Sequence, residues 1–185
     1  MKILILDRDG VINYDSEKYI KGVEEWEVIP DSLDAIANIT QLGYKIVVCT
    51  NQSGVGRGLF TIEKLNAIHE KMHRLVEQAG GKIAAVFFCP HAPTDNCACR
   101  KPKPGMIFDI CERFNIEDIS NVMMVGDSDR DLEAIHQAGG IPILVKTGSG
   151  KKTLSNGKIP PGTLVFDNLL KVSEYLIDRD HTYDK

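Results

Sequence analysis

The sequence predicts an α/β fold with a doubly wound, mostly parallel sheet of the Rossmann-like type. Two observations support this fold class. Short runs of β-branched and other apolar residues alternate along the chain with longer segments of helical periodicity. These short runs mostly lack polar alternation, which is typical of strands covered on both faces. Because parallel neighbours need crossovers that pack on the sheet, this order predicts right-handed strand-helix-strand units.

The elements follow one another in regular order. Leu65, Ile68 and Met72 place apolar side chains on one face of the second helix. Gly43 and Gly139 follow two predicted helices, as a helix-ending glycine commonly does. We expect strands at residues 3–6, 45–49, 83–88, 121–125, 141–145 and 164–166. We expect helices at residues 32–42, 61–79, 105–114, 129–138 and 168–177.

The composition is typical of one soluble globular domain. The chain has 185 residues, a formal net charge of -4 and 26% charged residues, against a usual share of about 25%. We therefore expect a single domain over residues 1–185, ending in a flexible polar tail at about 179–185. The weak negative charge offers no basic field for nucleic acid, so an anionic ligand must bind at a local site.

The sequence also predicts a cytoplasmic protein. The N-terminal apolar run stops at Asp7, too early for a secretory signal, and no segment approaches the roughly 18 apolar residues of a membrane span. The five cysteines are then expected to be reduced, and clustered thiols suggest a metal site before a disulfide. We expect neither nucleic acid nor membrane as a partner.

Three long connections begin where a predicted strand ends, at residues 10–31, 51–60 and 89–104. Long loops in compact domains are usually functional, and ligands of open α/β sheets bind at the carboxyl ends of the strands. Residues 148–162 contain Gly, Lys and Pro and are expected to form a surface loop. The site is therefore expected at the edge where the three long connections start.

Carboxylates and hydroxyls follow the first, second and fourth strands. Asp7 and Asp9 suit either divalent metal binding or a division between nucleophile and acid/base, and a solvated turn is the alternative. Residues 50–53 offer a hydroxyl, amides and successive backbone N–H groups for an anion, or a simple helix cap. Asp127 and Asp131 lie where a helix begins and could add further carboxylates to the same site. The alternative is that they only complement the dipole of that helix. The coincidence of all three at one sheet edge favours a site.

A cation precedes the helix at residues 105–114. A lysine beside carboxylates and a phosphate neutralises charge during phosphoryl transfer. Lys101 and Lys103 both lie in the RKPKPG segment, so chemistry alone does not choose between them.

Three thiols and one imidazole lie within residues 89–99: Cys89, His91, Cys97 and Cys99. Such a set suits a closed, tetrahedral and therefore structural zinc site. The alternative is a chance grouping of core and surface side chains. We expect a zinc-binding loop at residues 89–104, and core positions for Cys49 and Cys111.

The order of the motifs resembles the haloacid dehalogenase superfamily of phosphohydrolases. The matching segments are DRDG at 7–10, Thr50, Lys101 in RKPKPG, and GDSDRD at 126–131, and the resemblance spans about residues 1–150. It implies a fold of the haloacid dehalogenase type, and the two narrower families considered below, which lack a large cap domain, imply that this chain has none. It further implies that Asp7 is the nucleophile and Asp9 the acid/base, with an aspartyl-phosphate intermediate.

The same resemblance assigns further roles. Thr50 and Lys101 would contact the phosphoryl oxygens. Asp7, the carbonyl of Asp9, and Asp127 would hold Mg²⁺. Asp131 would orient either Lys101 or a metal-bound water. A P-loop phosphotransferase is disfavoured because no GxxxxGK[ST] segment is present.

A narrower resemblance rests on CPH followed by CxCRKPxPGM, together with DRDGVIN and TNQSGVGRG. These segments look like the D-glycero-D-manno-heptose 1,7-bisphosphate 7-phosphatases, monomeric cytoplasmic enzymes of heptose nucleotide and lipopolysaccharide core synthesis. The resemblance implies that Arg100 binds the second phosphate of a sugar bisphosphate. The residues implied to contact the sugar and the scissile phosphate are Asp15, Tyr19, Thr50, Asn51, Gln52 and Ser53.

Two alternatives remain. The histidinol-phosphate phosphatases share DRDG, the zinc loop and RKP, although KPGM at 103–106 fits the heptose enzymes better. The second alternative is an inactive zinc-binding interaction module. It is disfavoured because this chain retains all five residues that the resemblance places in the reaction: Asp7, Asp9, Thr50, Lys101 and Asp127. Arg57 contacts either a phosphate or solvent. His69, His73 and His136 lie on predicted helices without metal-ligand neighbours and are expected at surface or boundary positions.

Overall fold

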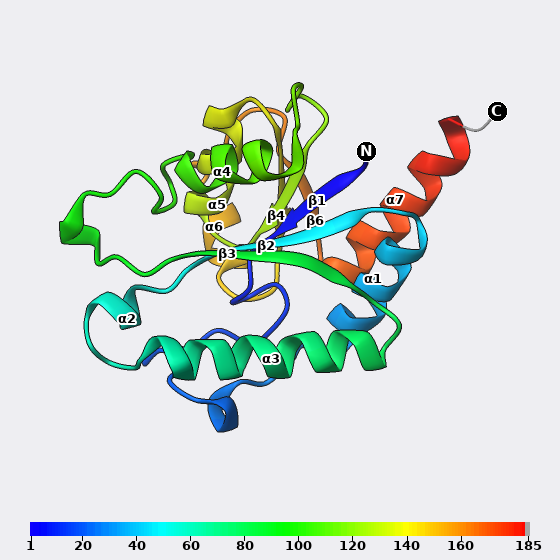
Figure 1. Ribbon diagram of the computed structural model, residues 1–185. Coiled ribbons are helices and arrows are strands. Elements are labelled where there is room, and N and C mark those ends of the chain that lie inside the picture. The colour runs from blue at the N-terminus through cyan, green and yellow to red at the C-terminus, as the bar shows by residue number, and fades with distance from the viewer. Residues whose placement is uncertain (184–185) are drawn as a thin grey trace.

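The computed structural model describes residues 1–183, with side chains through His181, and contains one six-stranded sheet between two helical layers (Figure 1). Its order is β3-β2-β1-β4-β5-β6, and every neighbouring pair is parallel. The predicted fold class is therefore confirmed. The strands are β1 Ile3–Leu6, β2 Lys45–Asn51, β3 Ile83–Cys89, β4 Met123–Gly126, β5 Ile141–Val145 and β6 Leu164–Phe166.

Helices cover both faces of the sheet. Strand β1 shows why its run is continuously apolar: Leu4 packs into one core layer and Ile5 into the other, and both are fully buried. Residues of α1 Pro30–Gln41, α3 Ile62–Gln78 and α7 Leu169–Tyr183 pack in the first layer. Residues of α4 Gly105–Phe114 and α5 Asp129–Ala138 pack in the second.

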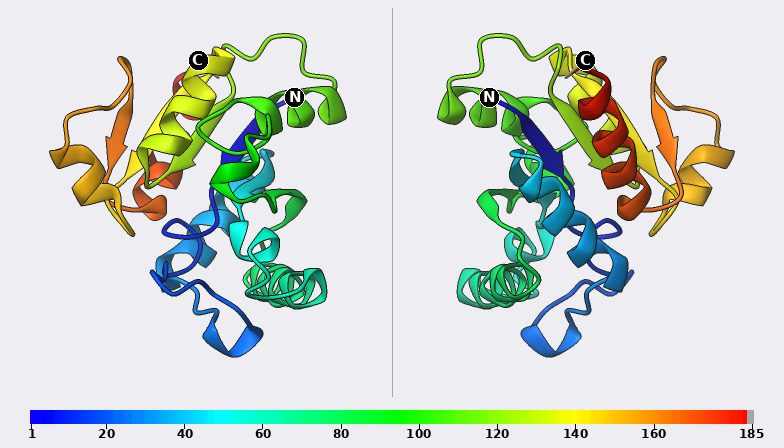
Figure 2. Two further views of the ribbon diagram at one scale, coloured as in Figure 1. Left: turned by 90° about the vertical axis from the view of Figure 1, so that its left-hand side faces the viewer. Right: turned by 90° about the vertical axis from the view of Figure 1, so that its right-hand side faces the viewer.

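The connections diverge beside β1. This strand pairs with β2 on one side and with β4 on the other, so the carboxyl ends of β1 and β4 lie at the point where the strand order reverses. Crevices at such points are the usual ligand sites of open α/β sheets. The N-terminal residue Lys2 contacts Asp180 of α7, and both lie on the side of the molecule away from the green loop that follows β3 (Figures 1 and 2).

Several element boundaries differ from the prediction. Helix α1 begins at Pro30, before the predicted start at Ser32, because proline suits the first helical position. The Ser32 hydroxyl instead donates to the Val11 carbonyl at 2.7 Å. Strand β2 extends to Asn51, and a short helix α2, Ser53–Gly56, follows it.

The predicted surface loop at residues 148–162 is partly wrong. It contains helix α6, Gly150–Ser155, whose Thr153 hydroxyl donates to the Asp127 carbonyl at 2.8 Å. A Cβ on Gly150 would overlap the Val145 carbonyl, so tertiary contacts fix this segment. Helix α7 continues past Ile177 to Tyr183, and the expected flexibility of the tail stays a prediction. Asp184 and Lys185 lie outside the described residues.

Within residues 1–183, no helix combines the length and apolar character needed to cross a membrane.

Candidate active site

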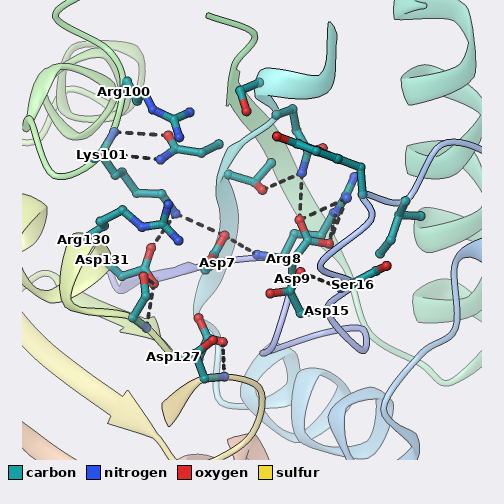
Figure 3. A pocket seen from close by; sticks show the side chains of 18 of the residues that line it. Asp7, Arg8, Asp9, Asp15, Ser16, Arg100, Lys101, Asp127, Arg130 and Asp131 are labelled. Atoms are coloured by element: carbon teal, nitrogen blue, oxygen red, sulfur yellow. Dashed lines mark hydrogen bonds and ion pairs between the residues drawn. The ribbon is translucent and has the colours of Figure 1, made fainter. Parts of the chain in front are cut away.

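A cleft of about 370 Å³ lies at the carboxyl ends of the central strands (Figure 3). The structure brings most of the candidate residues together, because all of them except the four cluster residues Cys89, His91, Cys97 and Cys99, and the second lysine Lys103, line this cleft. These residues are Asp7, Asp9, Asp15, Tyr19, Thr50, Asn51, Gln52, Ser53, Arg100, Lys101, Asp127 and Asp131. Arg57 also lines it, which leaves its two predicted roles open.

Asp7 is fixed at the sheet edge by the parallel ladder. Its backbone N–H donates to the Val125 carbonyl at 2.9 Å, so the chain remains aligned with β4 as it leaves β1. One carboxylate oxygen, Oδ1, accepts from the Arg8 N–H at 2.7 Å and lies 3.1 Å from Lys101 Nζ. Burial, followed by the negative charge of Asp131, raises the pKa of Asp7 well above its usual range.

Gly10 allows the next loops to approach. Its φ of 81° is left-handed, and a Cβ there would overlap the Asp127 carboxylate. Asp127 itself is buried just beyond β4, where its Oδ2 accepts from the Ser149 N–H at 2.7 Å. Burial and the nearby Asp131 raise the pKa of Asp127 to about 7. The chain thus brings Asp7 and Asp127 together by using glycine at the point of closest approach.

The two lysines of the RKPKPG segment have different surroundings. The Lys101 side chain is 2% exposed, and its Nζ lies 2.6 Å from Asp131 Oδ1 and donates to the Cys49 carbonyl at 2.6 Å. Burial opposes its charge, but Asp131 and Asp7 together hold the pKa of Lys101 above its ordinary value. Lys103 instead donates to Asn96 Oδ1 at 2.7 Å, outside the cleft. The geometry therefore selects Lys101 as the cation of the cleft.

Asp131 contacts Lys101 directly, as one of its two predicted roles requires. Its other oxygen, Oδ2, accepts from the Ser128 N–H at 3.1 Å and from the Ser128 hydroxyl at 2.6 Å. Ser128 precedes α5, so the same contacts cap the helix. Burial disfavours the carboxylate, yet Lys101 outweighs it and lowers the pKa of Asp131.

The Asp9 carboxylate is held away from Asp7 by a ring of donors (Figure 3). Arg8 Nη2 donates to its two oxygens at 2.8 and 3.1 Å, and Arg8 Nε donates to Oδ1 at 3.1 Å. Asn13 Nδ2 and Gln52 Nε2 each donate at 2.8 Å. Burial alone would raise the pKa of Asp9, but Arg8 and these amides lower it. Asp9 is therefore a carboxylate in this structure.

The segment after β2 forms internal bonds as well as lining the cleft. Gln52 Nε2 donates to the buried Thr50 hydroxyl oxygen at 3.0 Å in addition to Asp9. Asn51 Nδ2 donates to the Lys101 carbonyl at 3.0 Å, and Asn51 Oδ1 accepts from the Lys101 N–H at 3.1 Å. Asn51 therefore fixes the backbone that carries Lys101.

The acidic cluster fits a divalent cation. Carboxylate oxygens of Asp7, Asp127 and Asp131 all lie within 4.8 Å of one another. Burial raises the pKa values of Asp7 and Asp127, and the charge of Asp131 raises them further, because one lysine cannot neutralise three buried carboxylates. Carboxylate oxygens are preferred ligands of Mg²⁺. Because Asp131 is occupied by Lys101 and Ser128, Asp7 and Asp127 are the carboxylates that could hold the ion.

The loop after β3 forms the predicted Cys₃His group. Cys89 Sγ lies 3.6 Å from Cys97 Sγ and 3.2 Å from Cys99 Sγ, and His91 Nδ1 lies 3.3 Å from Cys99 Sγ. A tetrahedron with metal–sulfur bonds of about 2.3 Å has edges of roughly 3.8 Å, close to these separations. All cysteines are free of disulfides. The donor set and its spacing fit zinc, and all four positions are supplied by the protein.

Other cleft residues were not predicted. Arg130 reaches the rim from the first turn of α5, and Ser149 lines the cleft beside Asp127. Arg130 lies within the GDSDRD segment, but only the aspartates of that segment were given roles, and Ser149 lies in the stretch expected to be a surface loop. His69 is also a correction: it is buried on α3, with Nε2 3.3 Å from Arg8 Nη1. It lies four residues after Leu65 and three before Met72, so helical periodicity could have placed it on the apolar face.

Known proteins are similar to this chain over most of its length. Residues 1–139 match the family of haloacid dehalogenase-like hydrolases. The chain is 55% identical to the D-glycero-beta-D-manno-heptose-1,7-bisphosphate 7-phosphatase of Neisseria meningitidis, over 97% of each chain. It is 54% identical to the enzyme of the same name from Bordetella bronchiseptica, over 96% of this chain and 98% of that one.

Solved structures are similar over almost the full length. A crystal structure of D,D-heptose 1,7-bisphosphate phosphatase from B. bronchiseptica, complexed with magnesium and phosphate, is 53% identical with a TM-score of 0.95 and covers 97% of this chain and 99% of that one. The corresponding enzyme of Burkholderia thailandensis is 43% identical with a TM-score of 0.77, covering 96% and 99%. With these identities over almost the full length, the chain belongs to the haloacid dehalogenase-like hydrolases, among the D-glycero-beta-D-manno-heptose-1,7-bisphosphate 7-phosphatases.

Proposed function

We propose that this chain is a magnesium-dependent phosphatase that removes the 7-phosphate of D-glycero-β-D-manno-heptose 1,7-bisphosphate. The observation that carries the proposal is the Asp7–Lys101–Asp127 cluster, which lies at the strand-order reversal of a chain 55% identical to a phosphatase of that name. The names of these relatives support the β anomer, which the sequence alone left open.

The reaction proceeds in two displacements at phosphorus. An Asp7 carboxylate oxygen bonds to phosphorus while the bond from phosphorus to the sugar oxygen breaks, and Asp9 gives its proton to the leaving alkoxide. Asp9 then takes a proton from water, whose oxygen bonds to phosphorus as the bond to Asp7 breaks. Inorganic phosphate leaves, and both carboxyl groups return to their starting states.

Electrostatics makes attack by one anion on another feasible. Magnesium bound by Asp7, Asp127 and the Asp9 carbonyl supplies positive charge that offsets this repulsion. Lys101 adds a fixed ammonium 3.1 Å from Asp7 Oδ1. Thr50, buried at the end of β2, offers a hydroxyl to the phosphoryl oxygens.

Asp9 must change protonation state during the cycle. Arg8, Asn13 and Gln52 hold it as a carboxylate, the form that activates water. A phosphate dianion placed beside it raises the pKa of a carboxyl group, because like charges disfavour ionisation. Substrate binding thus promotes the acid form required for the first step.

Substrate specificity is proposed to come from the cleft rim. Arg100 binds the second phosphate, and Asp15 and Tyr19 contact the sugar. The cleft combines an acidic floor, suited to a cation, with arginines from three different segments at its edge: Arg57, Arg100 and Arg130. This distribution suits a substrate that carries a second anionic group distant from the reacting one.

The remaining assignments belong to the same proposal. Zinc is structural and holds the loop that leads into Arg100 and Lys101. Residues 1–185 act as one catalytic domain and as a monomer in the cytoplasm, where the product supplies heptose nucleotide for lipopolysaccharide core or another surface glycan. Size-exclusion chromatography with light scattering tests the monomer.

The test is phosphate release with magnesium from a defined panel. The panel contains both anomers of heptose 1,7-bisphosphate, histidinol phosphate and simple sugar monophosphates, compared by kcat/KM. We expect the β bisphosphate to be preferred by at least about a hundredfold over histidinol phosphate and the sugar monophosphates, because a site that binds a second phosphate discriminates against substrates that lack it. A preference for histidinol phosphate would keep the mechanism and overturn the substrate. A uniformly low rate would contradict both.

A further inference from the structure

Arg8 stands between the two aspartates of the DRDG motif in the sequence, and its side chain is buried, with 1% exposure. Its Nε and Nη2 donate to Asp9, and its Nη1 lies 3.3 Å from His69 Nε2 (Figure 3 shows the Arg8–Asp9 contacts). These are the side-chain partners of the guanidinium in the described part of the chain. A buried guanidinium has five N–H donors to satisfy, so each acceptor around it restricts how it can turn.

The contact defines the state of His69. Arginine can only donate hydrogen bonds, so Nε2 must accept, and the imidazole is neutral with its proton on Nδ1. The ring is buried on α3 and lies against Phe88, with centroids 6.2 Å apart. Burial and the charge of Arg8 lower the pKa of His69 to about 3, in agreement with a neutral ring. His69 is therefore a fixed acceptor at neutral pH.

The hydrogen bond to His69 Nε2 fixes the orientation of the Arg8 guanidinium plane. A guanidinium is planar, so fixing Nη1 on His69 also fixes the directions in which Nε and Nη2 point. Those nitrogens orient the Asp9 carboxylate, which forms no direct hydrogen bond with His69 in the described part of the chain. Loss of the acceptor would leave a buried donor unpaired and would favour rotation of the guanidinium.

We propose that His69 is a positioning residue for phosphate hydrolysis, which acts through Arg8 to orient Asp9. The inference rests on the proposed function, because it requires Asp9 to be the acid/base. It gives helix α3, more than fifty residues away from Asp9 in the sequence, a defined part in the reaction.

Two substrates with different leaving groups distinguish a loss of acid catalysis from a general loss of activity. A sugar alkoxide needs a proton when it departs, whereas p-nitrophenolate does not, so in the first step, which kcat/KM reports, only the sugar reaction depends on a well-placed Asp9. The second step, in which Asp9 activates water, is common to both substrates and affects kcat. We expect His69→Leu to lower kcat/KM for the heptose bisphosphate at least about tenfold, and that for p-nitrophenyl phosphate less than about threefold. His69→Gln, whose Oε1 can reach Arg8, should recover most of the loss.

Controls make every outcome informative. His73→Leu, one turn further along α3, should leave both rates unchanged. His69→Asn, which is polar but too short to reach Arg8, should behave like His69→Leu and serves if that variant does not fold. Equal losses on both substrates, no loss on either, or no recovery with glutamine would each overturn the role of His69. The proposed function is tested separately by the wild-type rate on the bisphosphate.

Discussion

Lys101 and Asp131 form an ion pair of 2.6 Å in which neither side chain is more than 2% exposed. With a bound divalent cation, the charges of this pair, Asp7 and Asp127 would balance. We expect Asp131→Asn to leave Lys101 incompletely paired and to lower the unfolding free energy by about 3 kcal/mol in magnesium buffer. A chain of this size would then melt roughly 6–12 °C lower.

Calorimetry of the purified variant measures this change. Asp129→Asn is the matched control because Asp129 lies in the same first turn of α5 but is exposed. Its melting temperature should equal that of the wild type. Equal melting of the two variants would show that the buried pair does not contribute to stability.

Asp7→Asn should abolish turnover while preserving the fold. The amide cannot form the phosphoryl bond, so we expect phosphate release to fall more than about a thousandfold, as for other nucleophile substitutions. Without magnesium, the variant should melt at or above the wild-type temperature, because one of several mutually repelling buried carboxylates is gone. Activity near that of the wild type would exclude Asp7 as the nucleophile.

Much of the fold could be predicted because buried parallel strands leave a clear sequence pattern. The central strands β1 and β4 are buried throughout, and their sequences are continuous apolar runs that do not alternate with polar residues. Helix α6 was missed because its short GKKTLS segment has no apolar periodicity and is held by contacts with Asp127 and Val145. Contacts between distant segments are not encoded in local pattern.

The site residues were likewise predictable where local sequence pattern places them, and not where contacts between distant segments do. Strand-end residues such as Asp7, Thr50 and Asp127 could be predicted because parallel strands bring their carboxyl ends to one edge. The choice of Lys101 over Lys103 depended on which side chain enters the cleft, and spacing alone does not determine that direction. Arg130 lies in the same segment as Asp127, but its sequence position did not show that its side chain reaches the cleft, and Ser149 follows no predicted strand directly.

The zinc loop should bind one metal ion per chain. Cys97→Ser combined with Cys99→Ser removes two of four ligands, so elemental analysis should find less than about a tenth of the wild-type zinc. Because the loop continues into Arg100 and Lys101, kcat/KM should fall as well. Cys111→Ser, outside the cluster, should retain both zinc and activity. Wild-type protein without zinc from a reducing preparation would contradict the assignment.

Arg100 should affect substrate affinity more than chemistry. Arg100→Gln removes a cation from the rim while leaving Asp7, Lys101 and Asp127 in place, so we expect KM for the bisphosphate to rise about tenfold with kcat little changed. Arg130→Gln should act in the same direction but more weakly, since Arg130 is exposed. Arg113→Gln, an exposed cation of α4 outside the cleft, is the control. A fall in kcat without a change in KM would place Arg100 in the chemical step instead.

Magnesium affinity should depend on pH through Asp127. In the metal-free protein the pKa of Asp127 is raised to about 7, so below this pH the metal must displace a proton that it does not encounter at higher pH. Binding therefore weakens as the pH falls: for one linked proton, the dissociation constant should rise about tenfold between pH 8 and pH 6. Isothermal titration calorimetry at the two pH values, without substrate, measures the change directly. Asp127→Asn should bind magnesium weakly and with a smaller pH dependence. If the affinity of the wild type did not change between the two pH values, Asp127 would not be a magnesium ligand.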